Sequence, residues 1–144
     1  MASDSTPRTL VKHALASDSA RDSILIQGWV RTRRDAKSFS FLEINDGSSL
    51  KNLQVIVDAS IPDYSNVEKA TTGASVSVTG KLVESQGKGQ NWEVVANTFT
   101  VVGESESDYP LQKKGHSLEF LREVAHLRPR SNLFGSVFRV RSRV

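Results

Sequence analysis

The middle of the chain, residues 24–102, alternates between apolar and polar positions in the way expected of β-strands. Such alternation places successive side chains on opposite faces of a sheet, with the apolar set facing the core. Turn residues divide this region, including Asp46 and Gly47 after the second apolar segment and the stretch from Gly87 to Gly89 before the last. The pattern predicts strands at residues 24–34, 39–45, 53–57, 74–83 and 92–102.

A short helix is expected between the third and fourth strands. Residues 62–72 have helical spacing, and Gly73 follows as a residue that commonly ends helices. Five strands with a helix in this place are the element order of the OB-fold, a small Greek-key barrel. Gly28 and Gly80 fall inside predicted strands, where such a barrel needs sharp bends. We therefore predict an all-β fold with minor helix, a five-stranded OB-fold barrel. The competing SH3-like barrel does not usually carry that helix.

The same criteria divide the chain into four parts. Ser- and Asp-rich residues with a helical pattern at 9–15 precede the strands, and a polar segment with helical spacing at 117–127 follows them. A further helical pattern begins after the break at Arg128-Pro129-Arg130. We expect an N-terminal extension with a short helix (1–23), an OB-fold domain (24–102), a helical linker or hinge (103–131) and the start of another domain (132–144).

Both C-terminal helices are expected to have one apolar face. The first comprises Leu118, Leu121, Val124 and Ala125, and the second comprises Leu133, Val137, Val140 and Val144. The predicted barrel offers no obvious partner for the second face, and its pattern is interrupted by the end of the sequence. We therefore expect a chain cut at the beginning of a further domain.

Composition excludes several classes of protein. The 144 residues contain no Cys, which excludes disulfides, thiolate metal sites and thiol nucleophiles. Three well-separated histidines (His13, His116 and His126) leave little material for a zinc site, so no metal site is predicted. No apolar run approaches the roughly 18 residues of a membrane-spanning helix. Acidic residues interrupt the N-terminal stretch, unlike in a transit peptide. A cytoplasmic protein without membrane contact is expected.

The charge is unevenly distributed. The net charge is +3, and the sequence pI is about 9.4. Residues 1–103 contain equal numbers of basic and acidic side chains, so the whole excess lies in residues 104–144. A basic protein is compatible with a polyanionic partner, although composition alone does not select nucleic acid.

No motif indicates a self-sufficient active site. The sequence contains neither a Gly-x-x-x-x-Gly-Lys-Ser/Thr phosphate loop nor a Gly-x-Ser-x-Gly nucleophile elbow. The segment from Gly87 to Trp92 begins like a dinucleotide-binding loop but lies between two strands, where a hairpin is expected. Glu43 and Asp46 resemble an acid–base pair, yet beside a turn such carboxylates are more often solvated or capping groups. No catalytic residue is predicted.

The second and third strands carry the better candidates for binding. Their aliphatic residues share one face, which leaves Phe41 and Gln54 on the opposite, outer face of the barrel. There an aromatic ring stacks on an unpaired base and an amide reads its Watson–Crick edge. The alternative interpretation makes Phe39 and Phe41 core residues, one of them packed against the linker.

Charged residues on the first and fifth strands extend this candidate site. Arg31, Arg33 and Arg34 end the first strand and would contact phosphate or base edges. Glu93 opposes the direction of its apolar neighbours, so its carboxylate could accept hydrogen bonds from guanine. The alternatives are a solvated strand end for the arginines and an ordinary exposed strand residue for Glu93.

Three stretches of sequence, in the first three predicted strands, together resemble a specific family. They are Gly28-Trp-Val-Arg-Thr-Arg-Arg-Asp35, Phe41-Leu-Glu-Ile-Asn-Asp-Gly-Ser48 and Leu53-Gln-Val-Ile-Val57. They resemble the N-terminal anticodon-binding OB domain of class IIb aminoacyl-tRNA synthetases. The segment from Tyr109 to Arg130, which ends in His126-Leu-Arg-Pro-Arg130, looks like the hinge of bacterial-type asparaginyl-tRNA synthetase. An aspartyl enzyme would be expected to carry a Leu-Asp-Leu-Arg-type segment there.

The resemblance implies roles for the residues that match the family pattern. Its stacking phenylalanine falls on Phe41 and is expected to support the central anticodon uridine. Its uridine-reading glutamine falls on Gln54. Arg34 matches the arginine that ends the first strand, and Glu93 matches the glutamate near the first anticodon base.

The resemblance also implies a larger enzyme. The family esterifies tRNA-Asn with asparagine, using ATP and Mg²⁺, through catalytic motifs that would lie beyond Val144, so this chain alone is expected to bind no cofactor and to be inactive. Residues from 132 onward look like the helix that forms the family's homodimer interface. The alternatives are a stand-alone OB-fold module for single-stranded nucleic acid, and a structural paralogue that contacts proteins.

Overall fold

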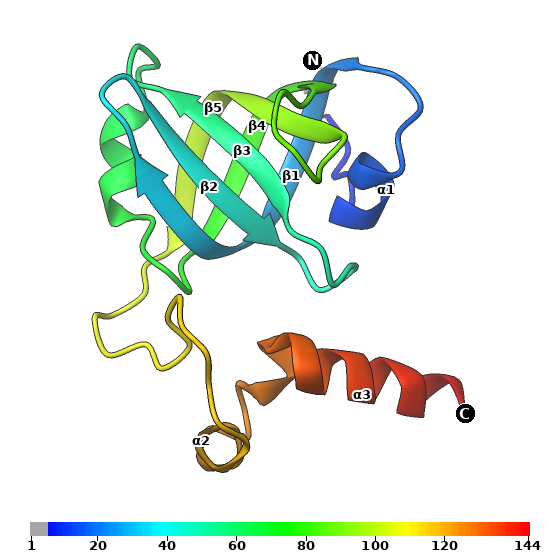
Figure 1. The fold of residues 1–144 in the computed structure, drawn as a ribbon. Helices are drawn as coiled ribbons and strands as arrows, with labels where there is room; N and C mark the ends of the chain where they lie inside the picture. Colours follow the sequence, from blue (N-terminus) through cyan, green and yellow to red (C-terminus); the bar gives the residue numbers. More distant parts are fainter. Residues whose placement is uncertain (1–5) are drawn as a thin grey trace.

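The alternating segments form strands that close into a barrel (Figure 1). The structure is a computed structural model that describes residues 6–144, so the first five residues of the predicted 1–23 extension lie outside the described residues. The predicted strands are confirmed, and only the second keeps its predicted bounds at both ends. The strands are β1 (Arg21–Asp35), β2 (Phe39–Asn45), β3 (Leu53–Asp58), β4 (Ser75–Glu84) and β5 (Trp92–Gly103).

The order of strands around the barrel is β1-β2-β3-β5-β4. The pairing of β3 with β5 is parallel, whereas β1 with β2, β2 with β3, β1 with β4 and β4 with β5 are antiparallel. A 3₁₀ helix, η1 (Tyr64–Lys69), lies between β3 and β4. This arrangement confirms the OB-fold prediction over the SH3-like alternative.

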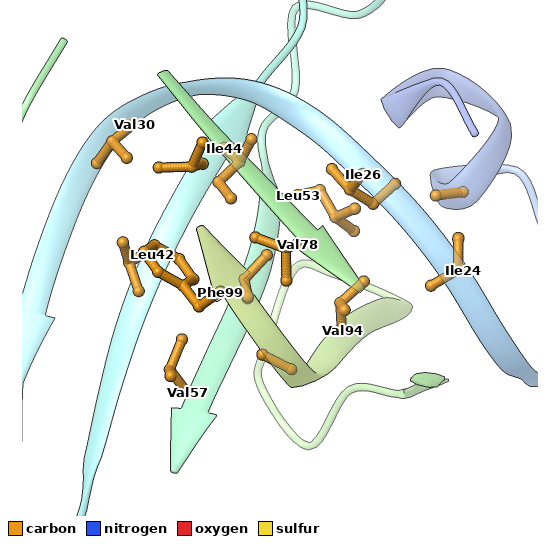
Figure 2. Close-up of a cluster of buried hydrophobic side chains, with 14 of the residues drawn as sticks. Ile24, Ile26, Val30, Leu42, Ile44, Leu53, Val57, Val78, Val94 and Phe99 are labelled. Atoms are coloured by element: carbon orange, nitrogen blue, oxygen red, sulfur yellow. The ribbon is translucent and has the colours of Figure 1, made fainter. Parts of the chain in front are cut away.

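The aliphatic positions of each strand fill the barrel. Figure 2 shows the labelled side chains pointing toward one another between the strands, and Phe99 and Leu42 belong to this buried cluster. Phe99, Leu42, Ile44 and Leu53 are all buried. Removal of this apolar surface from water stabilises the fold by roughly 25 cal/mol per Å². The period of two along β2 and β3 thus fixes which side chains remain outside.

Two glycines allow strands to approach more closely than any other residue would. A Cβ atom on Gly80 would lie 2.2 Å from the carbonyl oxygen of Val95, at a register shift between β4 and β5. A Cβ atom on Gly28 would lie 2.7 Å from the carbonyl oxygen of Asn45. The predicted bend is therefore confirmed as a register shift at Gly80, whereas Gly28 serves close packing of β1 on the end of β2.

The helix between β3 and β4 is shorter than predicted. It covers Tyr64–Lys69 instead of 62–72, and it buries Val67 against the barrel. Gly73 lies beyond its end with φ +94°. The ring of Tyr109 packs on Gly73, where a Cβ atom would lie 2.8 Å from it. Gly73 is thus required by a left-handed backbone and by a contact with the linker.

The C-terminal part consists of α2 (Leu118–Glu123), η2 (Arg128–Arg130) and α3 (Asn132–Arg143), which lie below the barrel in Figure 1. The break around Pro129 is confirmed. The first helix ends earlier than predicted, and of its expected apolar face only Leu121 is buried. Along α3, Leu133, Val137 and Val140 are exposed, as expected. None of the helices within residues 6–144 is long and apolar enough to cross a membrane.

The short helix α1 (Val11–Leu15) receives its cap from another segment. Its N-cap residue, Leu10, has no side-chain acceptor, so the N–H of Val11 donates to Oδ2 of Asp46 at 2.9 Å. The Asp46 side chain is fully buried. Burial acts to raise its pKa, but hydrogen bonds from Ser48 and Val11, with Arg8 nearby, outweigh it, so the pKa of Asp46 lies below its ordinary value of 3.8. Asp46 thereby attaches α1 to the β2–β3 turn.

Replacement of Asp46 by asparagine tests this cap. We expect the variant to lose about 1–3 kcal/mol of unfolding free energy at pH 7, because buried donors lose a charged acceptor. Because the pKa of Asp46 is lowered in the folded state, its stabilisation is present above the ordinary pKa of 3.8 and is lost as the pH falls through the folded pKa. Urea unfolding measured from pH 7 to pH 3 should show that the difference in unfolding free energy between the variant and wild type becomes smaller as the pH falls. Asp22→Asn, at an exposed position, is the control; a loss for Asp46→Asn that is constant with pH would contradict the assignment.

Candidate nucleic-acid interface

The register of the barrel arranges its outward side chains in rows that cross several strands. One row contains Thr32, Glu43, Gln54 and Glu93, and the next contains Arg34, Phe41, Ile56 and Val95. Residues two apart on adjacent strands are diagonal neighbours, with Cα atoms about 7–8 Å apart. Phe41 and Gln54 are related in this way, so the two residues selected by alternation lie side by side on the outer face.

The aromatic residues of β2 lie outside the core. Phe39 is 40% exposed and Phe41 is half-buried, and neither belongs to the buried hydrophobic cluster. The interpretation of both as core residues is therefore wrong. The guanidinium carbon of Arg34 lies 5.0 Å from the centre of the Phe41 ring. This cation–π contact leaves an aromatic surface and an exposed positive charge together at the end of β1 and β2.

The amide of Gln54 is held by a neighbouring strand. Its Nε2 donates to Oε2 of Glu93 at 3.1 Å, across the parallel pairing of β3 with β5. Gln54 itself is half-buried, so part of the residue remains accessible to solvent. The structure therefore joins two predicted site residues by a charge-assisted hydrogen bond.

Glu93 is buried, in contrast to the exposed strand residue considered as the alternative. It lies on the outer side of β5 as alternation predicts, yet only 6% of it is exposed. The loop between β4 and β5 folds back over it, and Ser85 Oγ donates to Oε2 of Glu93 at 2.9 Å. A third donor, Nε2 of Gln90, lies 3.5 Å from the same oxygen. The physical reason for the burial is thus the loop, which strand alternation does not describe.

The three arginines of β1 do not form one patch. Arg33 donates from Nη1 to the carbonyl oxygens of Val67 at 2.8 Å and Glu68 at 2.9 Å. Arg31 donates from Nη1 to the carbonyl oxygen of Arg130 in the hinge. A register shift between Val30 and Thr32 contributes to this separation. Of the three, Arg34 is the one beside Phe41.

The loop from Ser85 to Asn91 contains site residues that the sequence analysis missed. It is a hairpin, as predicted, closed by the N–H of Ser85 donating to the carbonyl oxygen of Asn91 at 2.9 Å. Ser85 precedes the glycines of the loop and Gln90 follows them, and both donate hydrogen bonds to Glu93. The available signal was the pair of polar residues that flank a glycine-containing turn just before a strand glutamate.

The two carboxylates considered for acid–base chemistry bind different partners. Glu43 is exposed and accepts a hydrogen bond from Asn52, whereas Asp46 caps α1. Among residues 6–144, no three His, Cys, Asp or Glu residues come together in a way that could hold a metal ion. The described outer face is arranged for stacking and hydrogen bonding.

A groove of about 760 Å³ separates the end of the barrel from the hinge. Arg130 from the hinge lies over Trp29, with its guanidinium carbon 4.4 Å from the ring centre. Arg139 of α3 donates to the carbonyl oxygen of Gly47. Arg130 and Arg139 of the C-terminal part thus lie at one end of the barrel.

A family model describes this barrel. The model of the tRNA anti-codon OB-fold nucleic acid binding domain matches residues 24–102. The chain belongs to this family. The matched range begins in β1 and ends in β5, so this OB-fold domain contains all four residues predicted for base recognition.

Curated relatives match beyond the OB-fold domain. The chain is 58% identical over 136 residues to an asparagine–tRNA ligase of Nitratidesulfovibrio vulgaris, covering 94% of this chain and 30% of that protein. It is 54% identical over 135 residues to one of Microcystis aeruginosa, with 93% and 30% covered. The chain therefore spans about 30% of the length of these relatives.

Solved structures agree in fold. The asparaginyl-tRNA synthetase of Pyrococcus horikoshii, complexed with asparaginyl-adenylate, superposes with a TM-score of 0.80 at 19% identity, covering 94% of this chain and 32% of that chain. That of Entamoeba histolytica, in complex with asparaginyl-adenylate, gives 0.69 at 25% identity, with 83% and 30% covered. The similarity to the Pyrococcus structure shows the fold alone.

The neighbouring residues Phe41 and Leu42 provide a matched test of the outer face. Phe41→Ala should cost about 1 kcal/mol of unfolding free energy, because the ring is half-buried on the surface. Leu42→Ala should cost about 2–5 kcal/mol, because it leaves a cavity in the barrel. Urea unfolding followed by circular dichroism measures both. Equal losses would place the Phe41 ring in the core.

Proposed function

We propose that this chain is the anticodon-reading part of an asparagine–tRNA ligase and that it binds the anticodon loop of tRNA-Asn. The observation that carries the proposal is the neighbouring pair Phe41 and Gln54 on the outer face of an OB-fold barrel. Its context is a chain 58% identical to a curated asparagine–tRNA ligase. An aromatic platform beside an oriented amide is suited to an unstacked base.

Each residue of the proposed site has a distinct chemical role. The ring of Phe41 stacks on the central anticodon base, and the amide of Gln54 hydrogen-bonds its Watson–Crick edge. Arg34 moves from the face of Phe41 to a phosphate or to a base edge. Glu93 lies near the first anticodon base, which its carboxylate approaches when the loop over it shifts. Recognition therefore depends on one ring, one amide and two charges.

Arg31 and Arg33 contribute as additional basic contacts to the RNA. Both are held by backbone carbonyl groups within the chain, so their charges have fixed positions. A fixed positive charge attracts the phosphate backbone without carrying sequence information. We assign them to affinity and assign base selection to Gln54.

The proposal places this chain in a longer cytoplasmic enzyme. That enzyme would activate asparagine with ATP and Mg²⁺, esterify tRNA-Asn and act as a homodimer. Residues 1–23 would be its N-terminal extension, 24–102 its anticodon-binding domain, 103–131 its hinge and 132–144 the start of its catalytic domain. The chain spans about 30% of the length of the curated relative, and we assign ATP and Mg²⁺ to the other part of the enzyme.

Alanine variants test the proposed site. Phe41→Ala and Gln54→Ala should each weaken binding to a tRNA-Asn anticodon stem-loop by about 5–150-fold, equivalent to about 1–3 kcal/mol for a stacked or bidentate base contact. Fluorescence anisotropy with labelled RNA measures the dissociation constant. Phe39→Ala is the matched control, because Phe39 lies on the same strand and face but one row away.

Unchanged affinity in both variants would contradict the site. A second titration replaces the central U of the loop by C. Equal binding of the two loops would favour a general single-stranded nucleic-acid module. Binding that is weak and insensitive to salt would favour a module for protein contacts, because phosphate contacts make affinity depend on salt.

A further inference from the structure

We propose that Glu93 and Ser85 are positioning residues that hold the Gln54 amide in one of its two orientations, so that the site selects a base with an imino N–H, uracil, over cytosine. The proposal rests on the proposed function, and it gives Glu93 a role through Gln54 in addition to any contact with the first base. Ser85 lies outside the residues selected from the sequence.

Hydrogen-bond donors converge on one oxygen atom of Glu93. Gln54 Nε2 lies 3.1 Å, Ser85 Oγ 2.9 Å and Gln90 Nε2 3.5 Å from Oε2. They come from β3 and from both ends of the β4–β5 loop. Because Glu93 is buried, with 6% of the residue exposed, these bonds are formed in a region where water competes weakly.

The chemistry of the carboxylate fixes the orientation of the amide. A glutamine amide has an acceptor, Oε1, and a donor, Nε2, and rotation by 180° about its last bond exchanges them. An ionised carboxylate accepts hydrogen bonds and cannot donate one. In the rotated amide, Oε1 of Gln54 would face Oε2 of Glu93. Two hydrogen-bond acceptors would then meet in a buried position with no hydrogen between them. Nε2 therefore faces Glu93, and Oε1 faces away from it.

The fixed amide recognises one arrangement of base atoms. Its Oε1 accepts a hydrogen bond, and one Nε2 hydrogen remains to donate. Uracil offers the complementary arrangement, an N3–H donor next to a carbonyl oxygen acceptor. Stacking on Phe41 fixes where the base lies, so cytosine presents its unprotonated N3 to Oε1, and no hydrogen bond forms between them. The N4–H₂ donor of cytosine lies further along the edge and reaches Oε1 only if the base shifts. An amide free to rotate would bind both bases, whereas the amide fixed by Glu93 favours uracil.

Ser85 fixes the carboxylate in turn. Its Oγ accepts hydrogen bonds from the N–H of Gly87 at 3.1 Å and from Nε2 of Gln90 at 2.8 Å. A hydroxyl has one hydrogen and two acceptor positions, so these two bonds leave its hydrogen for Glu93. The backbone N–H of Gly87 and the side chain of Gln90 thus determine the direction of the Ser85 hydroxyl, which holds Oε2 in place.

Three variants of the 144-residue chain test the proposal. Glu93→Gln introduces a side chain that can donate, and it should reduce the ratio of U-loop to C-loop affinity about tenfold. Ser85→Ala should reduce the same ratio about threefold, because the carboxylate loses its fixed donor. Ser85→Thr keeps the hydroxyl and should restore the wild-type ratio. A change in this ratio cannot come from a contact of Glu93 with the first base, because that base is the same in both loops.

Ser77→Ala is the matched control. Ser77 lies on β4 and its Oγ accepts a hydrogen bond from Gln27, so the variant also removes a serine–glutamine contact, remote from Glu93. Its affinity ratio should equal that of wild type. Urea unfolding of every variant shows whether the variant is still folded. A changed affinity ratio in a folded variant then reports on the orientation of the Gln54 amide.

The free protein provides a test without RNA. One side-chain amide proton of Gln54, bonded to a carboxylate, should resonate downfield of the other glutamine amide protons in a ¹⁵N-edited NMR spectrum. Glu93→Gln should move this resonance toward the others, and Ser85→Thr should leave it in place. A Gln54 resonance that is unchanged in Glu93→Gln would overturn the proposed orientation.

The outcomes separate the two proposals. If the wild-type chain prefers the U-loop and all variants keep that preference, the positioning role is wrong and the proposed function stands. If the wild-type chain binds both loops equally, the proposed function is wrong, and the base selection inferred here is wrong with it.

Discussion

The parallel pairing of β3 with β5 is the contact on which the rest of the structure depends. It closes the barrel between strands that are far apart in the sequence, and a closed sheet has no unpaired edge. The same pairing places Gln54 opposite Glu93. Gly80 permits the register shift in β4 that accompanies closure. Fold closure and the proposed site therefore share one set of backbone contacts.

A second group of contacts joins the hinge to the barrel. Tyr109 packs on Gly73, and the side chain of Arg130 covers Trp29 while its carbonyl oxygen accepts from Arg31. These contacts hold the hinge, with Arg130, at the end of the barrel. The net positive charge of the chain lies in this part, whereas the Phe41 face carries Arg34 of one sign and Glu43 and Glu93 of the other. Base selection is proposed for the Phe41 face, where it would rest on hydrogen-bond geometry and not on net charge.

Strand alternation was a reliable guide wherever one face of a strand packs in the barrel. It gave the bounds of β2 and put Phe41 and Gln54 outside, because a one-residue slip would expose the whole aliphatic set. It was less informative for short helices, since η1 is a 3₁₀ helix whose length depends on its packing over the barrel end. The three arginines of β1 were expected together, yet their partners lie in η1, the hinge and β2.

The sequence by itself determined the five strands, the barrel class and the outward direction of Phe41, Gln54 and Glu93, because these follow from a local period of two. Only the tertiary structure decided that Glu93 is buried and that Gln54, Ser85 and Gln90 donate hydrogen bonds to it. The physical reason is that a loop's path over a sheet depends on hydrogen bonds between residues on different strands, which have no periodic signal along the chain.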